Sequence, residues 1–276
     1  MNNEQIIAQH YHHGSLLAAI VNSLEKQNKN IGELSLDDLA PIDEFHLGGR
    51  VASKHFLSQL NFSHQDNVLD IGCGLGGAAR FIAHTYQSSV TGIDLTQEYI
   101  DTGNEISKWL ALAHKVQLKQ ASALSMPFEH ESFTGAFMMH VGMNIEDKQQ
   151  LFNEVNRVLK KQAYFGIYDV MQQTQHNIIY PVPWASAAEH SFIASVSDYE
   201  QRLSASNFEI IAINDRKEFA LNFFQKVKKE SKANRNITTL GVHTLMKSTA
   251  KSKINNLRTN IENGYIAPIE IIVRKK

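Results

Sequence analysis

The sequence predicts an α/β fold in which helices cover both faces of a doubly wound, mostly parallel sheet of seven strands. From Val68 onward, short apolar runs alternate with longer amphipathic stretches, which is the pattern of strand–helix–strand units. The expected connections are short, as compact α/β domains require. A Gly-rich segment, Gly72 to Gly77, follows the first apolar run and indicates a tight turn between a strand and a helix.

Seven apolar segments are the expected strands, and amphipathic stretches between the first five are the expected helices. The strands are expected at 68–71, 90–93, 116–119, 135–139, 164–169, 208–214 and 266–273. The helices are expected at 76–86, 97–113 and 147–160. The alternation breaks after Asp169, so we expect the chain to end as a sheet edge or hairpin and not as another parallel unit.

Further segments are expected on either side of this core. Apolar residues between 4 and 24 recur partly at helical spacing, and another helix is expected to begin after Gly48 and Gly49 and to run to Leu60. Residues 171–196 are too irregular for a simple crossover and are expected to form an insertion or cap. Ser197 and Glu200 have the spacing of a capping box, and a mainly helical region is expected up to about residue 263.

We therefore divide the chain, within one structural domain overall, into three parts. They are an N-terminal helical lid (1–60), a core (61–170), and a cap insertion with the C-terminal part of the sheet (171–276).

Composition excludes several classes of function. The 276 residues, 43% of them hydrophobic, suffice for one large α/β domain with a modest appendage. A net charge of -1 gives no basic footprint, so no nucleic-acid partner is expected. The single cysteine, Cys73, cannot form an intramolecular disulfide, and no apolar run approaches the ~20 residues that span a bilayer. With no export signal either, we expect a cytoplasmic protein without an integral membrane segment.

The Gly-rich turn is compatible with two classes of cofactor. Gly72, Gly74 and Gly77 have the G-x-G-x-x-G spacing of dinucleotide sites, and Asp94, about twenty positions on, fits both classes. Asp70, however, places a carboxylate beneath the turn, where it would repel a pyrophosphate and attract a cationic amino-acid group. S-adenosylmethionine (SAM) has that amino group and a sulfonium, and it has no phosphate. The carboxylate therefore favours SAM.

Several segments resemble motifs of the class I SAM-dependent methyltransferases. They are D-I-G-C-G-L-G-G at 70–77, G-I-D-L-T at 92–96, A-L-S-M-P-F at 123–128 and N-R-V-L-K at 156–160. Three further segments resemble one branch of this class, methyltransferase type 11, which contains sarcosine/dimethylglycine methyltransferase-like and phosphoethanolamine methyltransferase-like enzymes. These segments are D-E-F-H-L-G-G-R at 43–50, H-V-G-M-N-I-E-D-K at 140–148 and P-V-P-W-A at 181–185. The resemblance covers most of the chain and implies the class I methyltransferase fold, with a Rossmann-like core that binds SAM.

The resemblance also implies which residues hold SAM. The Gly-rich turn would hold the methionine part, Asp94 would accept hydrogen bonds from the ribose, and Leu95 would pack on the adenine. Where the family commonly has an Asp that meets the adenine amino group, this chain has Ser122, which can still make one hydrogen bond. The expected cofactor residues are Leu47, Gly48 and Gly49 of the lid, Asp70, Gly72, Cys73, Gly74, Gly76, Asp94, Leu95, Ser122, Ala123 and His140.

Methyl transfer from a sulfonium is an in-line displacement whose leaving thioether needs no proton, so few strictly catalytic residues are expected. An attacking amine or hydroxyl must still lose a proton, which makes a base near the strand ends worth seeking. His140 ends the fourth expected strand, Asn144 follows one turn later, and His46 precedes the glycines of the lid. These three are the candidate catalytic residues, while the roles of Asp43 and Glu44 stay open.

No histidine in the sequence has the paired spacing of a metal site, so no metal is expected.

Four functions remain in view. The favoured one is a SAM-dependent methyltransferase acting on a small molecule, with sarcosine, dimethylglycine or an ethanolamine derivative as the acceptor class that the resemblance implies. Within the class, the alternative is a quinone, isoprenoid or polyketide methylated on carbon or oxygen. Outside it, the alternatives are an NAD(P)-dependent oxidoreductase and a non-catalytic SAM-binding regulator. The oligomeric state is open, with a homodimer among the options.

Overall fold

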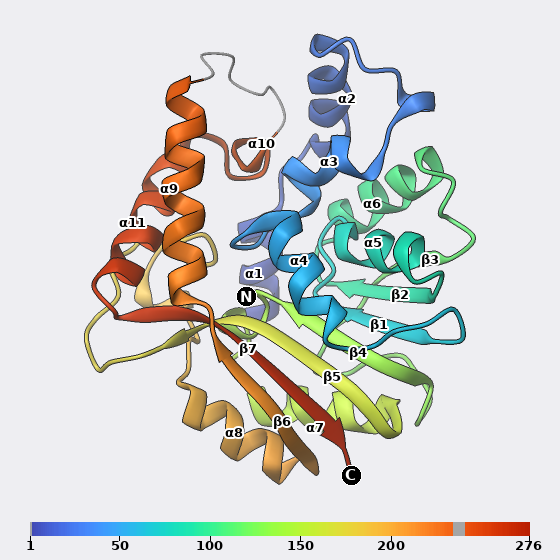
Figure 1. The fold of residues 1–276 in the computed structure, drawn as a ribbon, viewed down its shortest axis with the longest axis vertical. Coiled ribbons are helices and arrows are strands. Elements are labelled where there is room, and N and C mark those ends of the chain that lie inside the picture. The colour runs from blue at the N-terminus through green and yellow to red at the C-terminus, as the bar shows by residue number, and fades with distance from the viewer. Residues whose placement is uncertain (1, 234–240) are drawn as a thin grey trace.

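One seven-stranded sheet organises residues 2–233 and 241–276, the part of the chain that the computed structural model describes (Figure 1). The strands lie in the order β3-β2-β1-β4-β5-β7-β6. Strand β7 is antiparallel to β5 and β6, and the other neighbours are parallel. The bounds are β1 (Asn67–Ile71), β2 (Ser89–Asp94), β3 (Val116–Gln120), β4 (Phe133–Met139), β5 (Leu159–Gln172), β6 (Phe208–Asp215) and β7 (Ile266–Lys275). The predicted mostly parallel sheet is confirmed, and the chain does not end as another parallel unit. The expected edge or hairpin at the end of the chain is wrong, because β7 lies between β5 and β6 and helices separate it from β6 in the sequence.

Helices cover both faces of this sheet. Figure 1 shows α4, α5 and α6 on one face and α7 and α8 on the other. The helices are α1 (Asn3–Tyr11), α2 (Leu16–Lys26), α3 (Leu36–Asp43), α4 (Gly49–Ser58), α5 (Gly77–Thr85), α6 (Gln97–Trp109), α7 (Lys148–Val158), α8 (Val196–Ala205), α9 (Lys217–Ala233), α10 (Val242–Met246) and α11 (Ala250–Glu262).

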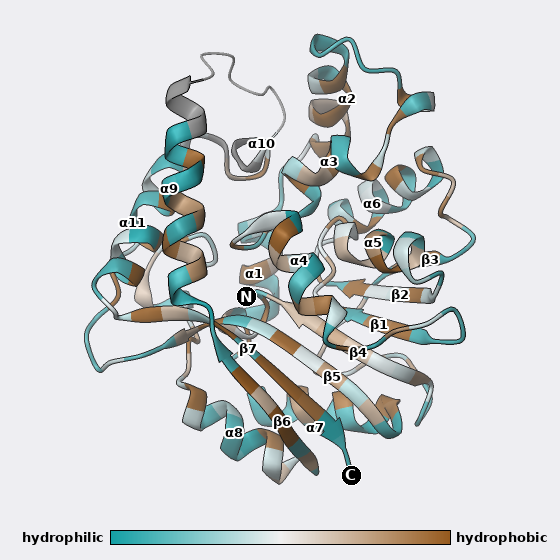
Figure 2. Cartoon of the chain, in the orientation of Figure 1, coloured by the Kyte–Doolittle hydropathy of each residue, from teal (hydrophilic) through white to brown (hydrophobic). Residues whose placement is uncertain are grey.

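Alternate residues of the strands build a separate apolar core on each face. On β1, Leu69 and Ile71 belong to the core under α7 and α8, whereas Val68 belongs to the core under α4, α5 and α6. A strand buried on both faces needs a continuous apolar run, which explains why these strands are recognisable in the sequence. Figure 2 shows the same property in β7, which is hydrophobic along nearly its whole length.

Two smaller apolar clusters attach the N-terminal and C-terminal segments. In the first, α2 and α3 pack on α6, with Leu16 and Ile20 against Tyr99 and Ile106. In the second, the insertion after β5 packs on α9 and α11, with Trp184 among its members. Within the described ranges, no helix has both the length and the apolar character needed to cross a membrane.

The capping box expected at Ser197 and Glu200 is wrong. Ser195 is the N-cap of α8: its hydroxyl accepts a hydrogen bond from the Asp198 amide at 3.2 Å, and the Asp198 carboxylate accepts one from the Ser195 amide at 3.0 Å. Ser195 has the extended backbone that an N-cap requires, whereas Ser197 already lies in the first helical turn. The shorter carboxylate of an Asp closes the box as well as a Glu would.

Several other boundaries differ from expectation. Helix α6 ends at Trp109 and not at 113, because Ala111 takes a left-handed φ of 54°. Strand β5 begins at Leu159, inside the helix expected over 147–160, and its register shifts near Gln162, which has a φ of 63°. Helix α3 was not predicted, although Ser35 and Asp38 form a capping box at its start. The expected C-terminal helical region contains α9, α10 and α11, and residues 234–240 of it lie outside the described ranges.

A buried ion pair docks α3 on α5. Arg80 Nη2 donates to Asp43 Oδ1 at 2.7 Å, and both side chains are fully buried. Arg80 Nη1 also donates to the Gly103 carbonyl at 3.0 Å and to Ser107 Oγ at 3.1 Å, both on α6. The guanidinium therefore joins three helices.

We expect Arg80→Met to lower the free energy of unfolding by about 3–5 kcal/mol, because it leaves the Asp43 carboxylate buried without its cation. Urea unfolding of both proteins measures the difference. Lys108→Met is the control, since Lys108 pairs with Glu105 at the surface, where ion pairs contribute little. If both variants lost the same free energy of unfolding, this role for Arg80 would be contradicted.

Candidate active site

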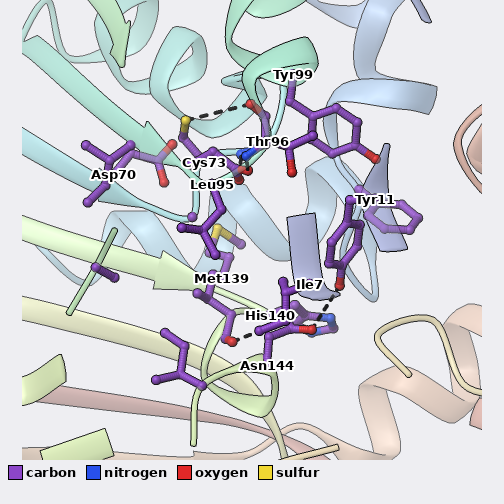
Figure 3. Close-up of a pocket in the computed structure, with 18 of the residues that line it drawn as sticks. Ile7, Tyr11, Asp70, Cys73, Leu95, Thr96, Tyr99, Met139, His140 and Asn144 are labelled. Carbon is purple, nitrogen blue, oxygen red and sulfur yellow. Dashed lines mark hydrogen bonds between the residues drawn. The ribbon is translucent and has the colours of Figure 1, made fainter. Parts of the chain in front are cut away.

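A cavity of about 260 Å³ lies at the carboxyl ends of β1, β2 and β4 (Figure 3). Asp70 of β1, Asp94 of β2 and Met139 of β4 line it, together with residues from α1, from the segment after α3 and from the loop after β4. Open α/β folds bind their ligands at this edge of the sheet. The location therefore makes this cavity the candidate site.

The Gly-rich turn forms one wall of the cavity. Gly72 and Gly74 have left-handed φ values of 69° and 53°, and a Cβ on Gly72 would lie 2.5 Å from Val141 Cγ2. Asp94 fastens the turn: its Oδ2 accepts a hydrogen bond from the Gly74 amide at 3.0 Å, and its Oδ1 accepts one from the Thr96 amide at 2.8 Å. Each carboxylate oxygen can accept a further bond. The Asp94 side chain can thus both hold the turn and receive a ligand.

The start of α5, where a dinucleotide would place its pyrophosphate, is in contact with the end of α3 on one side. A Cβ on Gly77 would lie 2.4 Å from the backbone oxygen of Asp43, so the two segments are in direct contact. Asp43 and Asp70 also bring carboxylates to the cavity next to this helix end. Asp70, whose Oδ2 has no partner among the described residues, would repel a pyrophosphate here. This end of the cavity is therefore unfavourable for a dinucleotide.

Asp70 is a buried carboxylate without a full set of partners. Its side chain is only 3% exposed, and its Oδ2 has no hydrogen-bond partner among the described residues. Burial raises the pKa of Asp70 well above its usual value, and the charges of Asp94 and Glu44 raise it further. Burial also raises the pKa of Asp94. Buried polar groups are normally satisfied, so this wall of the cavity is suited to a cationic ligand.

The opposite wall is a strained loop held by Asp169. His140 directly follows β4 and has a left-handed φ of 59°, and its amide donates to the Tyr168 carbonyl at 2.7 Å. The next two amides, of Val141 and Gly142, donate to the Asp169 carboxylate at 2.8 and 3.0 Å. The Tyr199 hydroxyl completes this anchor with a hydrogen bond of 2.8 Å to the same carboxylate.

Two histidine rings meet at the cavity. The rings of His46 and His140 are nearly perpendicular, with their centres 6.0 Å apart. Burial, reinforced by the charge of Arg50, lowers the pKa of His46 to about 4. Burial and the proximity of His46 lower the pKa of His140 well below its usual value. Both imidazoles are therefore neutral near pH 7.

Helix α1 crosses the cavity and contacts both of its walls. The Tyr11 hydroxyl donates to Asn144 Oδ1 at 3.2 Å, and the Ser122 hydroxyl donates to the Glu4 carboxylate. Figure 3 shows Ile7 and Tyr11 of this helix close to His140 and Asn144. The helix thus closes the cavity over the ends of the strands.

The residues expected from the sequence fall into two groups. Ten of them line the cavity: His46, Asp70, Gly72, Cys73, Gly74, Asp94, Leu95, Ala123, His140 and Asn144. The others do not line it: Leu47, Gly48, Gly49, Gly76 and Ser122.

Each residue of the second group has another environment. Leu47 is buried in the apolar cluster of the C-terminal segments, and its carbonyl accepts a hydrogen bond from the Tyr168 hydroxyl at 2.9 Å. Gly48 and Gly49 begin α4, with Gly48 packed against a phenylalanine ring. Gly76 is the N-cap of α5, and the Ser122 hydroxyl is bonded to Glu4.

Sequence reasoning missed the cavity residues contributed by helices. Ile7 and Tyr11 lie one turn apart on α1, Tyr99 lies on α6, and Leu245 lies on α10. The i, i+4 spacing of Ile7 and Tyr11 indicates a shared helix face, but it does not say what that face covers. For Leu245 we find no local signal.

The chain is similar to known methyltransferases in sequence. Residues 69–167 match the family described as "Methyltransferase domain". The chain is 26% identical over 166 residues to a sterol 24-C-methyltransferase of Candida albicans, covering 57% of this chain and 44% of that protein. The matched region covers about half the length of two such relatives, this sterol methyltransferase and a methyltransferase of Penicillium fellutanum.

Solved structures show the same fold. A geranyl diphosphate C-methyltransferase from Streptomyces coelicolor A3(2), in complex with S-adenosyl-L-homocysteine among other ligands, superposes with a TM-score of 0.73 at 17% identity, covering 100% of this chain and 98% of that one. A putative sarcosine dimethylglycine methyltransferase from Galdieria sulphuraria superposes with a TM-score of 0.64 at 19% identity, covering 82% and 83%. The fold is that of the class I methyltransferases.

The buried His46 makes stability depend on pH. Its pKa is about 4 in the folded state and 6.5 as a free side chain, so between these pH values the unfolded state binds more protons. Stability contributed by neutral His46 is therefore complete above pH 6.5 and is lost as the pH falls toward 4, by about 3 kcal/mol. We expect His46→Gln to remove this part of the pH dependence, measured by urea unfolding at pH 7.5 and pH 4.

The control is His64→Gln, because His64 is exposed. It should keep the pH dependence of the unmodified protein. An unchanged pH dependence in His46→Gln would show that the imidazole is not the titrating group.

Proposed function

We propose that this chain, whose residues 69–167 form a methyltransferase domain within a class I methyltransferase fold, transfers a methyl group from SAM to a small-molecule acceptor. The observation that carries the proposal is the unpartnered carboxylate oxygen of Asp70 in a cavity that also presents Asp94. A bound cation would satisfy that oxygen, and SAM carries an ammonium and a sulfonium. The same carboxylate would repel the pyrophosphate of a nicotinamide dinucleotide.

The residues present fit SAM along the whole wall formed by β1 and β2. Asp70 and the Gly72–Gly74 backbone would hold the amino-acid part, and Asp94 would accept bonds from the ribose hydroxyls. Leu95 and Ala123 would contact the adenine. When bound, SAM supplies a methyl carbon that is activated by the sulfonium. The chain itself contributes alignment and the exclusion of water, the two effects that such a displacement needs most.

The acceptor would lie on the opposite wall, between the two histidines and α1. His46, His140 and Asn144 are the proposed catalytic residues, and Tyr11 joins them through its bond to Asn144. The proposed lid, residues 1–60, includes α1 and the segment that carries His46. The other two proposed parts of the chain are a core of residues 61–170 and, at 171–276, a cap together with the C-terminal part of the sheet. A cytoplasmic location is part of the proposal, supported by the single buried Cys73.

The charge of the cavity favours an amine as the acceptor. Seven acidic residues line it, and no Lys or Arg is among the lining residues that the structure describes; the acids are Glu4, Asp43, Glu44, Asp70, Asp94, Glu146 and Asp147. Asp43 and Glu44 are paired with Arg80 and Arg50, which do not line the cavity, so the other five carry the argument. Such a surface attracts cationic and basic molecules and repels phosphorylated ones. We therefore propose an unphosphorylated amine. Carbon or oxygen methylation of an apolar acceptor is the alternative, supported by the apolar Ile7, Met139 and Leu245.

We expect the protein to bind SAM, and Asp94→Ala to weaken the affinity by about 100-fold through loss of two charge-assisted hydrogen bonds. Isothermal titration calorimetry measures the affinity, and circular dichroism checks that the variant is folded. Asp101→Ala, an exposed change on α6, should bind SAM normally. Stabilisation of the unmodified protein by NADH and not by SAM would overturn the proposal.

We expect transfer of label from methyl-labelled SAM to an amine in a panel of amines, phosphorylated amines, quinols, phenols and isoprenoids. Ethanolamine-type amines should be methylated faster than their phosphorylated counterparts, because the acids of the cavity repel phosphate. Mass spectrometry identifies the methylated product. Binding of SAM without transfer to any member would support a regulator, and labelling of an apolar acceptor alone would support the alternative within the class.

A further inference from the structure

A buried chain of polar contacts leads from the protein interior to the His46 ring. Arg50 Nε donates to Glu44 Oε1, and the Ser53 hydroxyl donates to Glu44 Oε2. His46 Nε2 lies 2.9 Å from Ser53 Oγ and 3.4 Å from Glu44 Oε2. Glu44 is 4% exposed and Ser53 is 0% exposed. Because water cannot compete for these bonds, their directions are set by the groups themselves.

The chemistry of each group decides which atom carries the proton. Glu44, in its ion pair with Arg50, is a carboxylate and can only accept hydrogen bonds. Ser53 has one hydroxyl proton and gives it to Glu44, so its oxygen can only accept from His46. His46 Nε2 must therefore carry the ring proton. Since burial keeps this ring neutral near pH 7, Nδ1 is left with a free lone pair.

His46 Nδ1 is available to a ligand. Across the described residues it has no hydrogen-bond partner, and the ring lines the cavity beside His140. His140 differs, since no hydrogen bond to its ring from the described residues sets its tautomer, and its Nε2 is unpartnered. Tyr11 cannot act as an anionic acceptor, because burial raises the pKa of its hydroxyl. Of His46, His140 and Tyr11, only His46 therefore presents a lone pair, on Nδ1, whose position is fixed by hydrogen bonds from its ring to the surrounding protein.

We propose that Glu44 and Ser53 hold His46 as the Nε2–H tautomer, so that His46 Nδ1 accepts a hydrogen bond from an N–H of the methyl acceptor and directs the acceptor's lone pair at the transferred methyl carbon. The nitrogen lone pair forms the new N–C bond as the C–S bond of the methyl donor breaks and the thioether leaves. The resulting ammonium keeps its N–H on His46 Nδ1 until it loses a proton to water. This rests on the proposed function. His46 contacts the acceptor, while Glu44 and Ser53 act through His46 and are positioning residues. The substrate class narrows accordingly to primary and secondary amines. Tertiary amines and carbon nucleophiles have no N–H to donate.

The low basicity of His46 suits this role. A histidine with an ordinary pKa would be partly protonated near pH 6.5, and its Nδ1 would then donate and repel a cationic amine. Burial prevents this protonation, with Arg50 on the far side of Glu44 adding to the effect. The groups that face His46 are Glu44 before it, Arg50 and Ser53 of α4, His140 after β4, and Tyr168 of β5.

The tautomer can be measured without any acceptor or SAM. Long-range proton–nitrogen NMR correlations of 15N-histidine-labelled protein distinguish the two neutral tautomers, and His46→Gln identifies the His46 signals. We expect the Nε2–H form in the unmodified protein and a mixture of the two forms in Ser53→Ala. Ser58→Ala, an exposed change on the same helix, should leave the signals unchanged. The Nδ1–H form in the unmodified protein overturns the proposal, whether or not the chain transfers methyl groups.

The part of the proposal that concerns the methyl acceptor is tested by letting a secondary amine and its tertiary counterpart compete for labelled methyl groups. We expect the secondary amine to be methylated preferentially, and Ser53→Ala to reduce that preference by about tenfold with the affinity for SAM unchanged. Equal rates for the two amines would overturn this half while leaving methyl transfer intact. Failure to bind SAM at all would instead overturn the proposed function, and the NMR result would stand independently.

Discussion

The buried ion pair of Arg80 with Asp43 determines the shape of the N-terminal side of the site. It attaches the end of α3 to the first turn of α5, and the tight contact at Gly77 leaves no room for either element to shift. The chain that follows, Glu44 to His46, therefore enters the cavity at a defined place. A surface pair could not impose this geometry, because exposed ion pairs are weak and screened.

This constraint accounts for the unusual electrostatics of the cavity. Asp43 reaches it with one oxygen neutralised by Arg80 and the other without a partner in the described protein. Asp70 lines the same cavity, and burial and neighbouring acids destabilise the ionised form of its carboxyl group, which raises its pKa. Several acids held together in a low-dielectric site raise one another's pKa and attract a cation. A sulfonium ligand and an amine acceptor both match that requirement.

The two histidines of the cavity, His46 and His140, are held in position by different contacts. His140 is held through its backbone, because the Asp169 carboxylate binds the two amides that follow and keeps a left-handed residue in place. His46 is held through its ring, by contacts with Ser53 and Glu44. Both rings stay uncharged because burial opposes protonation. The cavity thus combines anionic groups on one wall with neutral hydrogen-bonding groups on the other.

Local patterns in the sequence were enough to predict the seven strands, the Gly-rich turn and the positions of Asp70 and Asp94, because periodicity and turn chemistry depend on neighbouring residues. Position at the end of the fourth expected strand added His140 and Asn144, and the motif around the lid glycines added His46. The contributions of Tyr11 and Leu245, the bond of Ser122 to Glu4 and the burial of Leu47 away from the cavity came only from the folded chain. These contacts join segments that are far apart in the sequence, and no spacing rule along the chain encodes which helix face will meet which loop.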